Sequence, residues 1–424
     1  MSVKQVFNTS AELDYPKVLP TLDLDFANSK TLDPRITFTR ASGGTYVGAD
    51  GLIKYAGVNE ARFDHDPETG ESLGLLIEES RTNLLTSSFS TAGSNCTVTT
   101  DTSVTAPDGS LTAQKVQSTV SSGNMYSITN SITNNSGSSK YYCWSVFVKR
   151  GFNESGIISA QFGVINRGVV RYFFDTDTFE DPQTIYYNNP SRELYPNGWI
   201  RLHGIWEVPN GSTFNLIVVI TSVENDGGTN AYFYQWGAQL EEGSFPTSYI
   251  PTQGSTRTRS ADDATITGKN FTDFINQEEG TLYIDIIRSK FTEPGNTFSM
   301  SLYSTNTNYL GLDYTRIPTV SGSTYWVNET GNPTQVYFPS VANITPDRLN
   351  NHKYAVSYKN NYLSVASFGN YPSLNAPTIP KPSFTSMNFN RRAGNDFRRR
   401  LLHYRRVTYY PKAFTPSQLQ ALTS

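Results

Sequence analysis

The feature that most constrains this chain is side-chain alternation with a period of two residues, which recurs along most of its length. In YYCWSVFVKRG, Tyr142, Trp144 and Val146 fall on one side of an extended strand, while Cys143 and Phe147 fall on the other. Other segments repeat the pattern between Asn, Ser and Gly turns: VVRYFFDTDTF, NGWIRLHGIWEVP, FNLIVVITSV and AYFYQWGAQLE. Short strands about 8–12 residues apart, with turn residues between them, are typical of sandwiches and jelly rolls.

The composition favours the same fold class. Aromatic residues make up 13% of the chain and charged residues only 17%, a mixture rich in strand and turn formers and poor in helix formers. We therefore predict an all-β protein in which an N-terminal arm and a small β segment precede two antiparallel β-sandwich (jelly-roll) domains. One short helix is expected at the C-terminus, where Thr415, Pro416 and Gln418 form an N-terminal capping sequence.

A length of 424 residues indicates two or three domains, and the clearest seam lies in residues 236–266. There Trp236, Ala238 and Leu240 are predicted to alternate towards the core in the last strand of one sandwich, after which two prolines and a polar run indicate a solvated link. The predicted parts are an arm (1–20), a β segment (21–85), a first sandwich (86–252), a linker (253–268) and a second sandwich (269–424).

Charge and hydropathy restrict the partners. A net charge of −3 gives no general attraction to nucleic acid or to a membrane surface. The first residues lack the apolar core of a signal peptide, and we find no apolar run long enough to insert into a membrane. We therefore expect no nucleic acid as a partner, no membrane insertion, and synthesis in a cytoplasm without export by the usual route. Whether Cys96 and Cys143 form a disulfide stays open at this point.

The motifs give little support to covalent chemistry. GESLG, at residues 70–74, matches the G-x-S-x-G of a hydrolase nucleophile elbow, but a Pro/Gly turn precedes the serine and a strand follows it, so we interpret it as a β-turn. The four histidines have no metal-ligand spacing. Asp23 and Asp25 share one face of a strand, as a glycosidase pair could, but a solvated strand face is the simpler interpretation.

Short segments along the chain carry a resemblance to known families. LDPRITFTRAS, TYVGADG, DPETGES and GLLIEESRTNLL, together with NGWIRLHGIWEVP and the seam, resemble segments that bracket a carbohydrate-binding-module-like jelly roll in tail and fibre proteins of bacterial viruses. GTLYIDI, NNHKYAVSYKNNYLSV and RRVTYYPKAFTPSQLQAL resemble a concanavalin/laminin-G-type lectin sandwich. Ala61 departs from the first pattern, in which proline is common at this position. The resemblance implies the jelly roll for residues 86–252 and the lectin-like sandwich for residues 269–424.

Aromatic side chains at loops and strand edges are the candidate glycan-binding residues, because a flat ring packs against the C–H face of a sugar. A core or subunit contact is the alternative for each of them, and four tryptophans on predicted strands are expected in the core. The glycan-binding candidates are Tyr186, Tyr187, Tyr195, Tyr325 and Trp326, and the core tryptophans are Trp144, Trp199, Trp206 and Trp236.

Two charged sets are further candidates. The arginine-rich run near the C-terminus suits phosphate or carboxylate groups, or an acidic neighbouring subunit, with a solvated sheet face as the alternative. Its candidate residues are Arg391, Arg392, Arg398, Arg399 and Arg400. Jelly-roll modules often hold a structural calcium ion, for which Asp101, Asp108 and Glu242 are candidate ligands. No cofactor is expected to be required.

The resemblance implies a virion structural protein without enzymatic activity. Its expected form is a tail fibre or adhesin, made in the host cytoplasm, that docks to other tail or baseplate proteins by its N-terminal region and binds host cell-surface polysaccharide. Avidity in a homo-oligomer, with a trimer favoured by the resemblance, would compensate for weak single sites. Two alternatives stay open: a capsid or baseplate decoration protein that binds neighbouring virion subunits, and a polysaccharide depolymerase.

Overall fold

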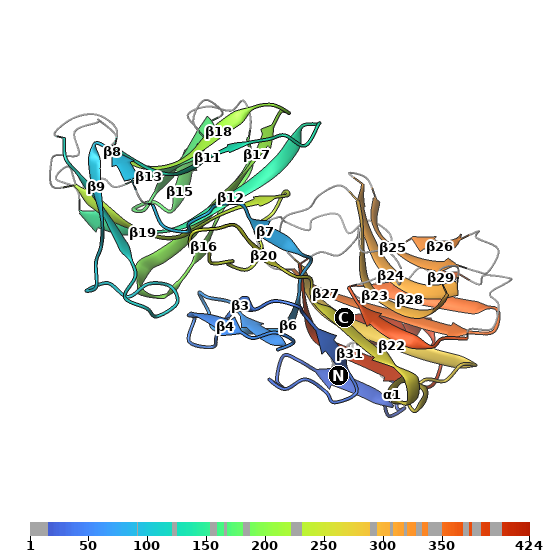
Figure 1. Ribbon diagram of the computed structural model, residues 1–424. Coiled ribbons are helices and arrows are strands. Elements are labelled where there is room, and N and C mark those ends of the chain that lie inside the picture. The colour runs from blue at the N-terminus through green and yellow to red at the C-terminus, as the bar shows by residue number, and fades with distance from the viewer. Residues whose placement is uncertain are drawn as a thin grey trace, which may run out of the picture. The chain divides into compact units, whose positions relative to one another are not determined.

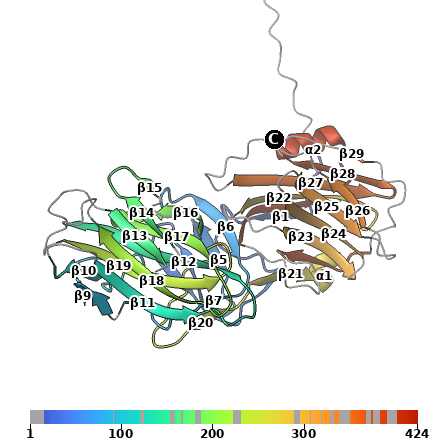
Figure 2. The same ribbon diagram turned by 90° about the horizontal axis from the view of Figure 1, so that it is seen from above.

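The computed structural model shows a chain built mostly of antiparallel strands, so the all-β prediction is confirmed (Figures 1 and 2). It describes residues 16–90, 92–120, 125–152, 159–164, 168–180, 187–221, 231–288, 295–305, 308–317, 320–327, 333–337, 350–367, 373–374, 383–390 and 401–424. The chain divides into two compact units: unit 1 is Met1–Phe38 with Asp263–Ser424, and unit 2 is Thr39–Asp262. Unit 2 is thus inserted in the sequence of unit 1, whereas the sequence indicated boundaries after residues 85 and 252.

Unit 2 contains two six-stranded antiparallel sheets. Their strands are β8 (Ala92–Ser94), β9 (Cys96–Thr100), β10 (Gln114–Ser118), β11 (Met125–Thr133), β12 (Lys140–Phe152), β13 (Ser159–Val164), β14 (Gly168–Phe173), β15 (Thr178–Glu180), β16 (Tyr187–Leu194), β17 (Trp199–Val208), β18 (Thr213–Thr221) and β19 (Tyr232–Glu242), with a 3-10 turn, η1 (Pro196–Gly198), before β17. One sheet has the order β16–β17–β12–β19–β10–β9, and the other has the order β15–β14–β13–β18–β11–β8.

Shorter strands flank the sandwich of unit 2. They are β3 (Gly44–Val47), β4 (Ile53–Ala56), β5 (Arg62–His65), β6 (Ser72–Ile77), β7 (Arg81–Asn83) and β20 (Arg257–Arg259). β3 pairs with β4, β5 with β6, and β7 with β20. The turn between β5 and β6 closes with a hydrogen bond from the Gly70 amide to the Asp66 carbonyl at 2.9 Å. Ser72 then begins a strand, which confirms that GESLG belongs to a β-turn and not to a nucleophile elbow.

The two sheets of unit 2 enclose a core of large aromatic rings. Trp144 on β12 and Trp206 on β17 pack on Phe162 of the facing sheet, with ring centroids 5.8 Å and 6.0 Å from it. All four tryptophans of this unit are at most 2% exposed, as predicted. Gly204 leaves room for this packing, because an added Cβ would lie 2.6 Å from the indole ring of Trp206. Burial of each such ring contributes about 1.5–3 kcal/mol to the stability of the sandwich.

A second core lies on the other face of the β12 sheet. Phe147 alternates with the first-core residues of β12, and its ring packs at 5.4 Å from Trp236 and 6.2 Å from Tyr249. Val47 and Ile53, from the β3–β4 hairpin, cover these rings. The segment predicted as a separate β region (21–85) therefore contributes side chains to the same unit as the predicted first sandwich. Both faces of β12 are buried over most of its length for this reason.

A β-bulge in β19 divides its side chains between the two cores. The register of β12 and β19 shifts between the Ser145–Gln239 and Phe147–Trp236 pairs, and Gly237 has φ of 60° there. Ala238 lies in the first core and Trp236 in the second. The prediction that Trp236 shares a face with Ala238 and Leu240 is therefore wrong, because the extra residue reverses the alternation.

Unit 1 also consists of antiparallel sheets. Its elements are β1 (Leu22–Asp25), β21 (Asp263–Thr267), α1 (Gly268–Thr272), β22 (Glu279–Arg288), β23 (Gly295–Thr305), β24 (Asn308–Ile317), β25 (Val320–Val327), β26 (Pro333–Tyr337), β27 (Asn350–Lys359), β28 (Tyr362–Ser367), β29 (Ser373–Leu374), β30 (Ser386–Phe389), β31 (Leu402–Tyr410) and α2 (Pro416–Thr423), while β2 (Thr37–Thr39) contains the boundary between the units. One sheet includes β29–β28–β27–β22–β31 with β1 paired to β31, and the other includes β21–β30–β23–β24–β25–β26.

The two sheets of unit 1 face each other through Phe389 on β30 and Tyr404 on β31, whose ring centroids are 5.1 Å apart.

Local predictions in unit 1 are confirmed. β27 and β28 form the predicted hairpin, in which Asn361 has φ of 52° at the two-residue turn. The capping box at Thr415 is present in α2, which packs against β27 and β28 (Figure 2). Of the helices that the structure describes, none has the length and apolar character needed to cross a membrane.

Candidate functional site

Three partly exposed aromatic rings lie together on one sheet face of unit 2. Tyr232 and Tyr234 alternate on β19, and Phe152 at the end of β12 pairs with Tyr232. All three lie on the face that carries Trp236, where Tyr234 packs against the second core. Phe152 is 48% exposed, and both tyrosines are partly exposed. We call Phe152, Tyr232 and Tyr234, together with Lys115 of β10, the aromatic platform.

The geometry of the aromatic platform suits a sugar ring. The Phe152 and Tyr232 rings are 6.4 Å apart and inclined by only 31°, while Tyr232 and Tyr234 meet edge to face at 5.6 Å. The ammonium group of Lys115 lies 4.0 Å from the centroid of Tyr232, where a cation–π contact fixes it over the ring. A surface with flat rings and fixed polar groups can bind both the C–H face and the hydroxyls of a pyranose.

The hydroxyl of Tyr234 remains protonated at any physiological pH. It donates a hydrogen bond to Asp101 Oδ2 at 3.4 Å. Burial, with the neighbouring Tyr232 and the charge of Asp101, raises the pKa of Tyr234 to about 12. The carboxylate in turn accepts hydrogen bonds from the amide and hydroxyl of Ser103, which help lower its pKa. Asp101 therefore acts as an ionised acceptor that orients the hydroxyl at one end of the aromatic platform.

Polar residues on the same face border the aromatic platform. Residues paired across antiparallel strands share a face, and this rule places Thr99 beside Lys115 and Gln117 beside Tyr232. Lys149 pairs with Tyr234 on the other side. Thr99 is exposed, and Lys149 and Gln117 are partly exposed. Hydroxyl, amide and ammonium groups thus surround the rings, as in the polar rim of a ligand site.

The glycan-binding residues predicted from the sequence do not form this site. Tyr195, a candidate for which a core contact was the alternative, lies in the second core: its side chain is 8% exposed and its ring packs at 5.0 Å from Phe147. Tyr187 lies in β16, and Tyr325 and Trp326 lie in β25, but their side chains are outside the described residues, as is all of Tyr186. For these four residues the assignment stays a prediction.

The predicted calcium ligands have separate partners. Asp108 accepts hydrogen bonds from Ser110 at 2.6 Å and 3.0 Å, Glu242 forms an exposed ion pair with Lys140 at 2.7 Å, and Asp101 is bound by Ser103 as described above. Among the described residues, no three His, Cys, Asp or Glu side chains are grouped so that they could hold a metal ion. The structure therefore does not group Asp101, Asp108 and Glu242 around one ion, and calcium dependence stays a prediction. Arg391, Arg392, Arg398, Arg399 and Arg400 lie outside the described residues.

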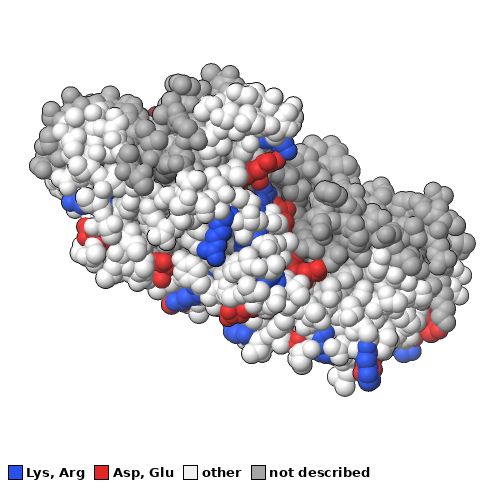
Figure 3. Space-filling model, viewed as in Figure 1, with Lys and Arg blue, Asp and Glu red and all other residues white. Residues whose placement is uncertain are grey.

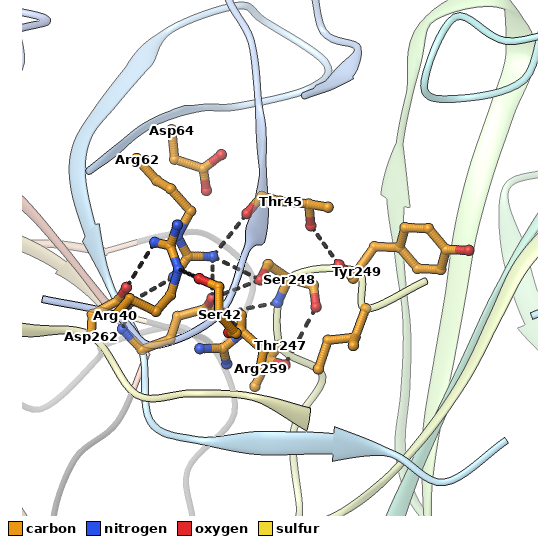
Figure 4. A network of polar contacts seen from close by, with 12 residues as sticks. Arg40, Ser42, Thr45, Arg62, Asp64, Thr247, Ser248, Tyr249, Arg259 and Asp262 are labelled. Carbon is orange, nitrogen blue, oxygen red and sulfur yellow. Dashed lines mark hydrogen bonds and ion pairs between the residues drawn. The ribbon is translucent and has the colours of Figure 1, made fainter. Parts of the chain in front are cut away.

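Unit 2 also contains a buried cluster of five charged residues, each at most 1% exposed: Arg40, Arg62, Glu78, Arg259 and Asp262. Arg62 donates to Asp262 at 2.5 Å, and Arg40 pairs with Asp262 at 3.1 Å (Figure 4). Arg62 also donates to Glu78 at 2.7 Å. Arg259 Nε lies 3.3 Å from Glu78 Oε2. We call these five residues the buried charge cluster.

Hydrogen bonds with neutral groups complete the buried charge cluster. The amide and hydroxyl of Ser248 donate to the two carboxylate oxygens of Glu78 at 2.8 Å and 2.7 Å. Burial alone would raise the pKa of Glu78, but Arg259, Arg62 and Ser248 together lower it to about 2. Burial and the nearby charge of Arg62 lower the pKa of Arg40, although Asp262 opposes this.

The buried charge cluster also corrects the predicted linker. Residues 253–258 are exposed, as a solvated link would be, but Arg259 and Asp262 are each 1% exposed. Asp262 contacts Arg40 and Arg259 lies beside Glu78, in a part of the chain where β20 pairs with β7. The polar run after the second proline is therefore partly an internal element of unit 2.

The described surface carries few charges on the face shown in Figure 3. Lys and Arg side chains there are interspersed with Asp and Glu among mostly uncharged residues. No disulfide joins the two cysteines, of which Cys143 is buried and Cys96 is partly buried.

Comparisons with known proteins give limited information. No protein-family model matches this chain, and no curated protein matches it. Among solved structures, the receptor-binding domain of botulinum neurotoxin mosaic serotype C/D is 10% identical, covering 38% of this chain and 38% of that one, at a TM-score of 0.30. The binding domain of botulinum neurotoxin DC, solved in complex with rat synaptotagmin II, is 10% identical over 39% of this chain and 40% of that one, at a TM-score of 0.31. This chain thus spans about two fifths of the length of those structures. At these TM-scores the similarity carries no conclusion about function.

Proposed function

We propose that this chain is a non-catalytic adhesin of a bacterial virus particle, which binds host-surface glycans through the aromatic platform of unit 2. The observation that carries the proposal is the grouping of Phe152, Tyr232 and Tyr234 on an open sheet face with Lys115. Contact of large aromatic rings with water is unfavourable, and an apolar surface that covers the rings removes this unfavourable contact. The C–H face of a sugar provides such a surface, and the surrounding hydroxyl and amide groups suit its hydroxyls.

The resemblance of several segments to tail and fibre proteins supplies the biological context of the proposal. In that context the N-terminal region docks to tail or baseplate proteins, and several copies, in a homo-oligomer with a trimer favoured, present the aromatic platform together. Each platform binds weakly on its own, and simultaneous binding of several copies raises the overall avidity. Neither a cofactor nor a covalent step enters this mechanism.

Binding to polysaccharide from the host bacterium tests the proposal directly. Phe152→Ala combined with Tyr232→Ala removes two of the three rings, and we expect the Kd measured by calorimetry to rise at least tenfold, or about 1.4 kcal/mol. Tyr141→Ala is the matched control, because Tyr141 lies at the opposite end of β12 and is 45% exposed, close to the 48% of Phe152. Equal loss of binding in both variants, or no loss in either, would contradict the assignment.

Two further experiments distinguish the adhesin from a depolymerase and from a capsid or baseplate decoration protein. A depolymerase would release new reducing ends from the polysaccharide, whereas an adhesin would bind it unchanged. Electron cryo-microscopy of intact particles shows whether the chain projects from the tail or is packed among capsid or baseplate subunits. Packing of the aromatic platform against a neighbouring subunit in the particle would favour the decoration protein over the adhesin.

A further inference from the structure

Two lysines flank Tyr234 on the sheet face that carries the aromatic platform. Lys115 on β10 and Lys149 on β12 are each paired with Tyr234 on β19, the strand between them. Residues paired across antiparallel strands share a face, so both lysine side chains project from the same face as Tyr234. Adjacent strands lie about 4.7–4.9 Å apart, which places the two lysine backbones roughly 10 Å from each other. A sugar unit bound over Tyr234 is therefore within reach of both ammonium groups.

Both ammonium groups are accessible from solvent. Lys115 and Lys149 are partly exposed, and neither ammonium nitrogen is among the buried polar atoms that lack a hydrogen-bond partner. The ammonium group of Lys115 is already held over the Tyr232 ring at 4.0 Å. Lys149, in contrast, forms no ion pair or hydrogen bond with the residues that the structure describes. The charge of Lys149 is therefore available to an anion from another molecule.

The carboxylates described on this face lie away from Lys149 or beside other cations. Asp101 directly follows β9, at the edge of the sheet, and its charge interacts with that of Lys115. β9 and β12 lie on opposite sides of β19, so Asp101 is on the far side of the rings from Lys149. In the other direction along the sheet, Glu193 of β16 lies 3.9 Å from Arg201. The side of the aromatic platform next to β12 is therefore where an anion is favoured.

Rings and cations on one face suit a sugar that carries a negative charge. The rings pack against the C–H face of the sugar. An ammonium group is a compact charge with three donors, which binds a carboxylate or a phosphate equally well. Hydrogen bonds between charged partners are stronger than those between neutral ones. A charged sugar therefore makes a contact with Lys149 that a neutral sugar cannot make.

We propose that the glycan bound by the aromatic platform is an acidic polysaccharide, whose carboxylate or phosphate group binds Lys149 while its sugar packs on the rings. Lys115 acts as a second, weaker cationic contact. The proposal rests on the proposed function, because it names the class of glycan for the same site. The chain has a net charge of −3, so attraction to an acidic polymer requires a local group of cations and does not come from the protein as a whole.

Chemical treatment of the host polysaccharide tests the need for a charge. One sample has its carboxyl groups reduced to alcohols, another has its phosphate groups removed with hydrofluoric acid, and fragments of matched length are compared by calorimetry with the full chain. We expect one of the two treatments to raise the Kd at least about twofold, as for the loss of an ion pair, and so to identify the bound group. Unchanged affinity after both treatments would overturn the proposal.

Variants assign the effect to the two lysines. Lys149→Gln should raise the Kd for the untreated polysaccharide about two- to fivefold, as expected for the loss of one partly exposed ion pair. Lys115→Gln should have a smaller effect, because Asp101 partly balances that charge. Lys149→Arg keeps the charge and should keep the affinity. Lys140→Gln is the matched control, since Lys140 lies at the opposite end of β12 and forms an exposed ion pair with Glu242. Equal affinities of Lys149→Gln and the control would refute the role of Lys149.

Salt gives an independent measure of the same contact. Raising the ionic strength from about 0.01 M to about 1 M shortens the Debye length from about 30 Å to about 3 Å, which screens interactions between exposed charges. Binding of the untreated polysaccharide by the wild-type protein should therefore weaken with salt, and binding by Lys149→Gln should weaken less. The same salt dependence in both proteins would contradict an ion pair at Lys149.

The proposed function and the acidic glycan fail in different ways. If Phe152→Ala with Tyr232→Ala binds the polysaccharide as tightly as the wild type does, the aromatic platform is not the glycan site and the proposed function is overturned. If that variant loses binding, but neither the chemical treatments nor Lys149→Gln alter the Kd, the aromatic platform binds a neutral glycan. Only the acidic glycan is then overturned.

Discussion

Replacing Glu78 with glutamine probes how strongly the buried charge cluster stabilises unit 2. The substitution keeps the shape of the side chain but leaves Arg40, Arg62 and Arg259 with Asp262 as the only carboxylate of the cluster. Glu78 is completely buried, so solvent does not screen these interactions. Removing one partner of a buried ion pair leaves a buried charge uncompensated, which typically costs about 3–5 kcal/mol.

The lowered pKa of Glu78 gives a second value for the free energy by which its ionised carboxylate stabilises unit 2. Lowering a carboxyl pKa from 4.5 to about 2 corresponds to about 3 kcal/mol, at about 1.4 kcal/mol for each pKa unit. Because the pKa is lower in the folded state, this stabilisation is fully present above pH 4.5. It is lost progressively as the pH falls from 4.5 towards 2, because Glu78 becomes protonated in the unfolded state at a higher pH than in the folded state. Both routes therefore predict a loss of at least about 3 kcal/mol for Glu78→Gln at neutral pH.

Urea denaturation followed by tryptophan fluorescence measures this loss. Four of the five tryptophans of the chain lie in unit 2, so the signal reports mainly on that unit. Glu242→Gln serves as the control: Glu242 is a carboxylate in an exposed ion pair, whose removal should cost less than about 1 kcal/mol. Between pH 4.5 and 2, the wild-type protein should lose more stability than Glu78→Gln. A Glu78→Gln protein as stable as the control variant, or with the same pH dependence as the wild type, would refute this reasoning.

Three further predictions concern other parts of the chain. Burial raises the pKa of the Cys96 thiol to about 11 and that of the Cys143 thiol well above its usual value. Both thiols should therefore react slowly with a disulfide reagent at pH 8 in the native protein and rapidly in urea. Fast labelling of Cys143 in the native protein would contradict its burial. Gly280→Ala should destabilise unit 1 by about 1–3 kcal/mol, because the added Cβ would clash with the Tyr409 hydroxyl. An unchanged unfolding midpoint in near-ultraviolet circular dichroism would show that the site can adapt. Thr415→Ala should cost about 1 kcal/mol by removing the capping box of α2, which would appear as faster amide exchange in that helix only.

The features that the sequence predicted correctly depend on neighbours along the chain. The alternation in β12, the turn at Asn360–Asn361 and the capping box at Thr415 are each set by a few consecutive residues. The same holds for GESLG, whose flanking turn and strand were enough to exclude a nucleophile elbow. In these cases local conformational preference and tertiary packing agree.

The features that the sequence did not reveal depend on register and on distant pairing. Trp236 was placed on the wrong face because one bulge at Gly237 reverses the period-two pattern, and a glycine within a strand is the only local sign of such a bulge. The aromatic platform joins Phe152 to Tyr232, which are about 80 residues apart and become neighbours only through the pairing of β12 with β19. Tyr232 and Tyr234 did alternate visibly in AYFYQW, and that part of the site could have been found.

Burial of the charges after the seam could not be predicted for a similar reason. A run such as STRTRSADD has the composition of a solvated segment, and each charge in it is unfavourable inside a protein unless it finds a partner. The partners Arg40, Arg62 and Glu78 lie about 180–220 residues earlier in the chain. Only the assembled fold of unit 2 brings them together.

The pairing of β1 with β31 has a consequence for how the chain is made. Leu22 pairs with Tyr409, so these partners are about 390 residues apart in sequence. At about 5–20 residues per second, a ribosome needs roughly 20–80 s to cover that distance. All of unit 2 emerges in the interval and can fold while β1 still lacks its neighbour. We therefore expect translation stalled before residue 402 to yield a protease-resistant unit 2 attached to an unpaired, degradable N-terminal strand.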